Sequence, residues 1–287
     1  SAARPLPKWR RPYQELGPVS APGDVVGDGR DVVLFADTFN RAFERENLEA
    51  AERVLDRLGY RRHRVLPVRG RRALCCGRTY LTAGDAENAK LEAQRVIDTL
   101  APFVERGAKV VGLEPSCILS LRDELQALIP AATTAALGNA SMTIEELIAG
   151  DLAAGRLAMP ATDARRSKVL LHGHCHQKAG GGMGPVEAVL KALPGVELEV
   201  VQSSCCGMAG AFGYQSETVE VSKAMGELSL LPAVRAAAAD TLIVADGTSC
   251  RHQIADSRAF AEGSSHHRSP ACAGIEPNQG RGPRFFR

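Results

Sequence analysis

The sequence lacks the features of a secreted or membrane-spanning protein. Its proline- and arginine-rich beginning contains no apolar core of the kind that a signal peptide carries, and no run of about 18 apolar residues follows. The net charge is only +2, so nucleic-acid binding is not expected. The arginines between residues 61 and 72 indicate either a solvated loop or a docking surface for an acidic partner. Together these absences predict a cytoplasmic protein without a transmembrane segment.

Several motifs of catalysis and nucleotide binding are also missing. The sequence contains no P-loop, no Ser–His–Asp signature, no C-x-x-C-x-x-C run and no flavin-binding motif. The glycine-rich segment 179–185 does not fit G-x-G-x-x-G, and it is typical of a flexible turn or, alternatively, of an anion-binding helix start. What the sequence does have is eight cysteines among 287 residues. Without a secretory signal, they indicate metal or redox chemistry rather than a disulfide framework.

Short apolar segments alternate with amphipathic ones along most of the chain. DVVLFA, HRVLPV, KVVGLE, SKVLLHG, ELEVVQ and DTLIVAD are typical of buried strands, and the segments between them have helical spacing. This alternation predicts an α/β fold of two similar βαβ-type lobes, with mostly parallel sheets, internal duplication and disordered termini. We expect a linker (1–28) downstream of another part of a longer protein, a first repeat (29–130), a helical connector (131–166), a second repeat (167–255) and a disordered tail (256–287), in which Cys272 belongs to no site.

The two lobes share three landmarks in the same order. VVLFADTFN (32–40) aligns with VLLHGHCHQ (169–177), ALCCGRTYLTAG (73–84) with SSCCGMAGAFGY (203–214), and VVGLEPSC (110–117) with LIVADGTSC (242–250). Each landmark follows the carboxyl end of an expected strand, and in a parallel sheet these ends lie at one edge. The pattern predicts a duplication that gathers distant cysteines at the same place in each lobe.

The cysteines at these strand ends are the candidate metal ligands. The second repeat offers Cys175, Cys205, Cys206 and Cys250. The first repeat offers a possible second metal site made of Cys75, Cys76 and Cys117. Thiolates select zinc, copper(I) or the iron of iron–sulfur clusters. Adjacent cysteines point to opposite faces of a regular strand, so a tight turn at Gly77 or Gly207 is needed to bring both inward; the alternative is that one member of each pair is a small core residue.

Three histidines surround the first cysteine of the second repeat, in the segment LHGHCHQK. His172, His174 and His176 alternate, so on a strand they would share one face. They could bind zinc together with Cys175, or His174 or His176 could donate hydrogen bonds to a cluster or to a substrate. A polar loop at a strand end is the third interpretation.

These residues resemble a known family. The duplicated Cys-Cys-Gly triplet resembles the cysteine-rich CCG domain, which is present in tandem in a subunit of heterodisulfide reductase, in the iron–sulfur subunit of glycolate oxidase and in related lactate-utilisation and glycerol-3-phosphate dehydrogenase subunits. The phrases LFADTFN, LCCGRTYL, LEPSC, HGHCHQKA, CCGMAGAFGY and LIVADGTSC resemble the C-terminal region of FAD-linked dehydrogenases of D-2-hydroxyacids, of the D-lactate or D-2-hydroxyglutarate type. The resemblance covers residues 30–255.

The resemblance implies an iron–sulfur electron-transfer module of an oxidoreductase, in which a flavin oxidises the hydroxyacid and clusters carry electrons to an acceptor. It implies a 4Fe–4S cluster, FAD on a missing or partner region, and two partners: a flavin-binding domain or subunit and a ferredoxin-like iron–sulfur segment. A quinone-linked partner would allow peripheral membrane association. Alone, the chain is not expected to oxidise a hydroxyacid.

The sequence departs from the fullest form of this motif, which has five cysteines in each repeat. Gly247 stands where a further cysteine would precede Cys250, and Thr38 and Glu114 stand at two cysteine positions of the first repeat. These departures argue against a complete noncubane cluster and favour the second repeat as the metal site. The alternatives are a zinc-stabilised structural or docking module and a thiol–disulfide catalyst, similar to heterodisulfide reductase, that uses its vicinal cysteines.

Overall fold

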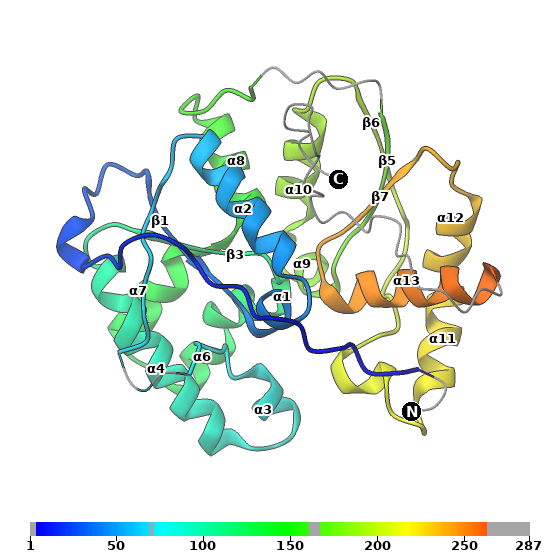
Figure 1. Cartoon of the computed structure of the whole chain (residues 1–287), viewed down its shortest axis with the longest axis horizontal. Helices are drawn as coiled ribbons and strands as arrows, with labels where there is room; N and C mark the ends of the chain where they lie inside the picture. Colours follow the sequence, from blue (N-terminus) through cyan, green and yellow to red (C-terminus); the bar gives the residue numbers. More distant parts are fainter. Residues whose placement is uncertain (1–3, 69, 71, 161–166, 263–287) are drawn as a thin grey trace. The chain divides into compact units, whose positions relative to one another are not determined.

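The computed structural model describes residues 4–68, 70, 72–160 and 167–262, with no side chains assigned beyond residue 256 (Figure 1). These residues divide into two compact units. The N-terminal unit comprises Arg10–Leu157, and the C-terminal unit comprises the chain from Ala158 onward together with the segment that ends at Trp9. Most of the predicted tail, from residue 263, lies outside the described residues.

The N-terminal unit is built on four parallel strands in the order β2-β1-β3-β4. The strands are β1 (Asp31–Phe35), β2 (Arg61–Arg62), β3 (Lys109–Gly112) and β4 (Ser141–Thr143). The helices are α1 (Thr38–Ala42), α2 (Arg45–Arg57), α3 (Arg78–Thr82), α4 (Ala86–Val104), α5 (Pro115–Ile118), α6 (Glu124–Leu128), α7 (Ala132–Ala140) and α8 (Ile144–Ala153), with 3-10 turns at η1 (Pro22–Asp24) and η2 (Leu119–Leu121).

Helices cover both faces of this sheet. Val33 and Phe35 of β1 pack in one core cluster with residues of α4 and α7, among them Leu100. Because alternate side chains of a strand point to opposite faces, the buried Val32 and Leu34 face the other layer. Figure 1 shows α2 and α8 on that second face, opposite α4, α6 and α7. The unit is therefore a three-layer α/β structure, as the alternation predicts.

The segment between the two repeats contributes directly to the first sheet. β4 pairs with β3 from Ser141 to Thr143, and α8 follows at once. A capping box begins α8, since the Thr143 hydroxyl accepts from the Glu146 amide at 3.2 Å and the Glu146 carboxylate accepts from the Thr143 amide at 2.8 Å. Part of the segment 131–166, which was expected to connect the two lobes, therefore belongs to the sheet of the first lobe.

The C-terminal unit contains three parallel strands in the order β6-β5-β7. The strands are β5 (Ser167–His172), β6 (Val196–Val200) and β7 (Leu242–Ala245). The helices are α9 (Cys175–Ala179), α10 (Met183–Lys191), α11 (Val219–Glu227), α12 (Leu230–Ala236) and α13 (Thr248–Glu262), with a 3-10 turn at η3 (Gly210–Gly213). In both units the first strand lies between the second and the third, as a duplication requires; the duplication itself stays a prediction.

The core of the C-terminal unit also has two sides. Val169 and Leu171 of β5 pack with α10, whereas Leu170 packs with α12 and α13. Cys206 and Cys250 belong to the cluster that contains Leu170, on the side of the sheet covered by α12 and α13. Apolar packing therefore holds these two buried cysteines in place.

Several elements differ in detail from the sequence-based expectation. The segment HRVLPV (63–68) forms no strand, and β2 is the two-residue strand Arg61–Arg62 just before it. After the His63 amide bonds to the Val32 carbonyl the chain leaves the sheet, and Pro67 has no amide hydrogen to donate. The helical segments that follow β3 and precede β7 are each divided, the first into α5, η2 and α6, and the second into α11 and α12. Both breaks leave the βαβ alternation intact.

Arg4 lies in the predicted linker but is buried in the C-terminal unit. Its guanidinium donates to the Gly213 carbonyl at 2.7 Å and to the Ser222 hydroxyl at 3.1 Å, and it pairs with Asp256 at 2.8 Å. A buried guanidinium needs such partners, because an unpaired buried charge is strongly unfavourable. The contact joins the beginning of the chain to α11 and α13.

Three arginines of the cluster before the first triplet pair with carboxylates of their own unit. Arg61 bonds to Asp31, Arg62 to Glu52, and Arg72 to Glu92. These pairings favour a solvated, self-neutralised surface over a docking site for an acidic partner. In the part of the chain that the structure describes, no helix combines the length and apolar character that a membrane crossing requires.

Candidate metal centre

Four thiols follow the carboxyl ends of the three strands of the C-terminal unit. Cys175 opens α9 after β5, Cys205 and Cys206 lie in the loop after β6, and Cys250 lies in the first turn of α13 after β7. All three strands are parallel, so these positions share one edge of the sheet. The sequence predicted that the cysteines converge at one edge because it predicted parallel strands, and the strands are parallel.

The four thiols form a continuous line of contacts. Hydrogen bonds from the Cys175 and Cys206 thiols lower the pKa of Cys205 to about 2. Contact with Cys206 lowers the pKa of Cys250 well below its ordinary value, against the opposing effect of burial. The hydrogen bonds that favour these two thiolates raise the pKa of Cys175 and of Cys206. The site thus has two sulfurs that favour negative charge, each next to a sulfur that keeps its proton.

Backbone amides point at these sulfurs. The Gly207 amide donates to Cys205 Sγ at 3.3 Å, and the Met208 amide donates to Cys206 Sγ at 3.4 Å. The His176 amide also lowers the pKa of Cys175 by hydrogen bonding, although the Cys205 contact outweighs it. Amide donors stabilise thiolates and tune the potential of bound clusters.

The turn that presents the vicinal cysteines requires glycine. Gly207 has φ +87°, and a Cβ there would lie 2.2 Å from the Ser222 carbonyl oxygen. Gly77, in the first triplet, has φ +81°, and its Cβ would lie 3.1 Å from the Ala89 carbonyl oxygen. The left-handed backbone and the close approach of a helix together explain why glycine follows each cysteine pair.

The three histidines do not share a strand face as the spacing suggested. His172 ends β5, whereas His174 is the N-cap of α9, with its Nδ1 accepting from the His176 amide at 3.2 Å. The ring centroids of His174 and His176 are 5.2 Å apart. Because β5 ends at His172, the side chains of His174 and His176 do not follow the alternation of a strand.

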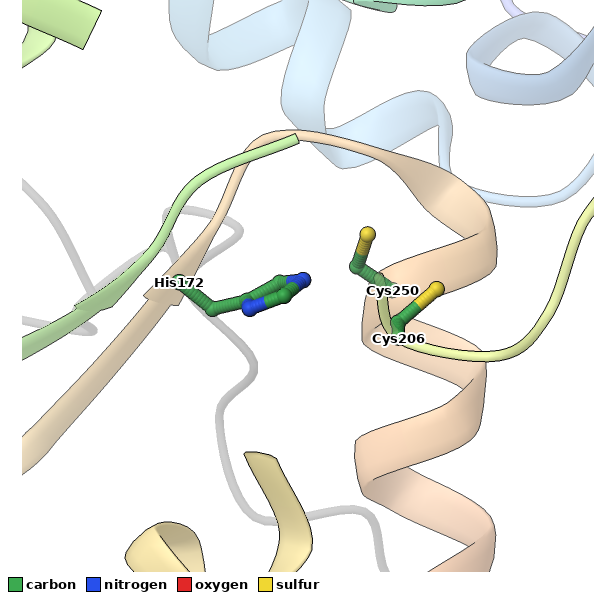
Figure 2. Close-up of side chains that lie close together, drawn as sticks. All are labelled: His172, Cys206 and Cys250. Atoms are coloured by element: carbon green, nitrogen blue, oxygen red, sulfur yellow. The ribbon is translucent and has the colours of Figure 1, made fainter. Parts of the chain in front are cut away.

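His172 lies near both buried sulfurs of the site. Its ring nitrogen and the sulfurs of Cys206 and Cys250 lie within 4.8 Å of one another, and Figure 2 shows the imidazole pointing at both thiols. A second group within the same limit contains His174, Cys175 and His176. The site therefore contains two groups of nitrogen and sulfur atoms that could bind a metal ion.

His174 occupies the space above Gly247. A Cβ on residue 247 would lie 2.2 Å from His174 Cδ2 and 2.8 Å from its Nε2. The position where the fullest motif has another cysteine therefore cannot carry a side chain while the imidazole stays in place. The ring and the glycine form a complementary pair.

We expect Gly247→Ala to displace the His174 ring and destabilise the C-terminal unit by about 1–3 kcal/mol, the usual cost of overpacking. Gly150→Ala, inside α8 where a Cβ meets nothing within 4 Å, is the matched control and should stabilise the helix by about 0.5–1 kcal/mol. Thermal unfolding of the two variants provides the measurement. Equal melting temperatures for Gly247→Ala and the unchanged protein would contradict the packing of the ring against the glycine.

Lys178 is the residue of this site that sequence reasoning missed. It follows Cys175 by three residues in α9, and this spacing was the signal available, because it places both on one helix face. Its ammonium donates to the Ser203 carbonyl and, at 3.3 Å, to the Ser203 hydroxyl. Burial lowers the pKa of Lys178, and the facing thiols, Cys250 first among them, oppose that effect. A positive charge thus accompanies the thiols.

Comparison with known proteins identifies this part of the chain. Residues 169–255 match the family model CCG, described as a cysteine-rich domain. We refer to these residues as the CCG domain. The match includes all four cysteines of the C-terminal site.

The chain is similar to curated proteins that are dehydrogenases or subunits of them. The chain is 28% identical over 181 residues to a subunit of the anaerobic glycerol-3-phosphate dehydrogenase of Escherichia coli (strain K12), and the match covers 63% of this chain and 44% of that subunit. It is 26% identical over 227 residues to the D-2-hydroxyglutarate dehydrogenase of the same organism, covering 78% of this chain and 21% of that protein. A similar match, at 25% identity, is found with the D-2-hydroxyglutarate dehydrogenase of Pantoea ananatis (strain AJ13355). The chain thus spans less than half the length of the relatives it matches.

The cysteines of the N-terminal unit, outside the matched CCG domain, also lie together but in a different electrostatic setting. Hydrogen bonding with Cys76 raises the pKa of Cys75, and bonding with Cys117 raises the pKa of Cys76. The bond to Cys76 lowers the pKa of Cys117, but burial and the carboxylates of Asp37 and Glu114 outweigh it and raise that pKa to about 11. Two buried carboxylates thus take the place that cationic and imidazole groups have in the CCG domain. All three thiols favour the protonated form.

The CCG domain fits a thiolate-bound metal centre better than the N-terminal unit does. Its donor set is four thiols, and cysteines in fours hold iron–sulfur clusters. It adds amide donors to the sulfurs, and the Nε2 atom of His172 is buried without a hydrogen-bond partner among the described side chains. Within the described residues all seven cysteines are free, so no disulfide competes for them.

Proposed function

We propose that this chain is the iron–sulfur electron-transfer part of an FAD-linked 2-hydroxyacid dehydrogenase. Cys175, Cys205, Cys206 and Cys250 would hold a 4Fe–4S cluster. The observation that carries the proposal is the line of contacts among four thiols from three separate segments, two of which favour the thiolate form. The names of the curated relatives, both of them dehydrogenases, support the redox setting.

The residues around the thiols would hold and insulate the centre. When bound, an iron–sulfur cluster supplies one-electron transfer, with a potential set by charge, hydrogen bonds to sulfur and solvent exposure. The amides of Gly207 and Met208 would stabilise the ligating sulfurs, and the imidazole of His174 would exclude water beside Gly247. Cys206 and Cys250 are buried, whereas Cys175 is exposed and would mark the side on which electrons enter or leave.

The rest of the electron path would lie outside this chain. FAD on another domain or subunit would oxidise the 2-hydroxyacid, and a ferredoxin-like iron–sulfur segment would lie between the flavin and the CCG domain. Cys75, Cys76 and Cys117 remain a possible second metal site, although their raised pKa values make it the weaker one. Alone, the chain would carry electrons without oxidising a substrate.

Metal and sulfide analysis of the anaerobically purified protein tests this proposal. We expect iron and acid-labile sulfide in equal amounts, broad visible absorbance from sulfur-to-iron charge transfer, and a change in both absorbance and electron paramagnetic resonance on reduction with dithionite. Absence of both iron and labile sulfide from folded protein, before and after anaerobic reconstitution, would overturn the proposal.

Zinc is the second candidate, because the nitrogen of His172 and the sulfurs of Cys206 and Cys250 already lie within 4.8 Å of one another. Zinc accepts such mixed nitrogen and sulfur ligands and would make the CCG domain a structural or docking module. Stoichiometric zinc without visible absorbance, together with loss of folding in a chelator, would support this function instead.

A further inference from the structure

The imidazole of His172 has one partnered and one unpartnered nitrogen. Nδ1 lies 2.9 Å from the Ser203 hydroxyl. Nε2 is buried and has no hydrogen-bond partner among the described side chains, yet it faces Cys206 and Cys250 (Figure 2). What this nitrogen offers to the sulfurs depends on where the imidazole proton lies: a lone pair could bind a metal, whereas an N–H group could only donate to sulfur.

Ser203 determines the proton position through its other neighbour. The ammonium of Lys178 donates to the Ser203 hydroxyl at 3.3 Å and also to the Ser203 carbonyl. An ammonium group cannot accept a hydrogen bond, so the hydroxyl proton must point elsewhere. Among the described residues the acceptor at hydrogen-bond distance is Nδ1 of His172. Nδ1 therefore carries the lone pair, and Nε2 carries the proton.

The sulfurs that face this nitrogen favour the same arrangement. A ring nitrogen of His172 and the sulfurs of Cys206 and Cys250 lie within 4.8 Å of one another. A sulfur that ligates a metal accepts hydrogen bonds, so an N–H group directed at it is favourable, whereas a lone pair directed at it is not.

We infer that His172 is a hydrogen-bond donor to the ligating sulfurs of the bound centre and not a metal ligand, with its proton placed by a Lys178–Ser203–His172 relay. The proton position follows from the protein alone. The contact with a bound centre rests on the proposed function. An N–H donor to a ligating sulfur stabilises the more negative, reduced state of a cluster, so loss of the donor shifts the reduction potential to more negative values.

The first experiment locates the proton without a metal. Histidine is labelled with 15N in the reduced full-length chain after metal removal, and circular dichroism checks that the fold is retained. The chain contains seven histidines, so the His172 signals are assigned by their loss in His172→Gln. We expect a 15N chemical shift typical of unprotonated nitrogen at Nδ1 and of protonated nitrogen at Nε2. A protonated Nδ1, alone or with Nε2, would overturn the inference.

Ser203→Ala and Ser203→Thr form a matched pair for the relay. The alanine variant removes the hydroxyl that donates to Nδ1, so the single tautomer should give way to a mixture, whereas threonine keeps the hydroxyl and should keep the tautomer. The same mixture in both variants, or in neither, would contradict the relay.

The second experiment examines the iron-loaded protein and decides the matter where the metal-free chain does not stay folded. Electron–nuclear double resonance on the reduced cluster should show only a weak 15N coupling from His172, as expected for a nitrogen that is hydrogen-bonded to a ligating sulfur; a strong coupling typical of iron-bound nitrogen would overturn the inference. His172→Leu should shift the reduction potential to more negative values, and His172→Gln, whose amide retains N–H groups, should shift it less. Equal potentials in all three proteins would also contradict the inference. Absence of iron would refute the proposed function, while the 15N shifts of the metal-free chain would still decide the proton position.

Discussion

We expect Cys250→Ser to lose almost all the bound iron and labile sulfide of the anaerobically purified protein. Cys250 is 2% exposed, contacts Cys206 and lies in the first turn of α13, so no other cysteine of the described chain takes its position. A serine hydroxyl stays protonated where the thiol of this residue favours the thiolate, so it is a poor ligand for iron. Since loss of even an outer partner of a ligand costs about 10–100-fold in metal affinity, loss of a ligand should cost at least that much.

Two cysteine variants serve as controls for this result. Cys272→Ser changes a residue that belongs to no predicted site and lies outside the described part of the chain, so iron should be unaffected. Cys117→Ser changes the cysteine cluster of the N-terminal unit and should leave the visible spectrum of the CCG domain in place. A Cys250→Ser protein with the iron content and spectrum of the unchanged chain would remove the basis of the proposed site.

Gly207→Ala should destabilise the C-terminal unit more than Gly247→Ala does, because it combines two unfavourable effects. A left-handed backbone costs an L-residue about 1–2 kcal/mol. The new Cβ would also lie 2.2 Å from the carbonyl oxygen of Ser222, a backbone atom of α11 that moves only with its helix, and such overpacking adds about 1–3 kcal/mol. The sum, about 2–5 kcal/mol, is a large part of the stability of about 5–15 kcal/mol that is typical of a domain.

Thermal and urea unfolding of Gly207→Ala measure this loss, and iron content reports whether Cys205 and Cys206 are still presented together. Gly181→Ala is the matched control, because Gly181 also has positive φ, at +71°, but a Cβ there meets nothing within 4 Å. It should cost only the backbone part, about 1–2 kcal/mol. Equal stability of Gly207→Ala and Gly181→Ala would show that the contact with the Ser222 carbonyl does not contribute to the loss of stability.

The contrast between the two cysteine clusters shows how neighbours change the chemistry of the same triplet. In the CCG domain Lys178 and the imidazoles of His172 and His174 surround the thiols, and two of the four thiols favour the charged form. In the N-terminal unit Asp37 and Glu114 lie near Cys117, and every thiol there has a raised pKa. We therefore expect the two cysteine clusters, although both are presented by similar turns at Gly77 and Gly207, to differ in affinity for a cationic centre.

The sequence predicted only part of the hydrogen bonding to the sulfurs. A turn at the glycine of each triplet was expected, because two adjacent cysteines cannot both point inward on a regular strand. That the same turn directs the Gly207 and Met208 amides at the sulfurs depends on backbone angles that the letters do not specify. The role of Ser203 was likewise invisible, since it acts through a contact with a residue 31 positions earlier.

The sequence alone determined the α/β alternation, the glycine turns and the placement of cysteines after strand ends, because these depend on local periodicity, on backbone sterics and on the parallel arrangement that βαβ units impose. Only the tertiary structure decided that β4 joins the first sheet, that Arg4 is buried beside α11 and α13, and that His172 and Lys178 face the thiols. A three-residue strand and a single buried side chain carry no periodic signal. Their places are set by long-range packing and by the partners that buried polar groups must find.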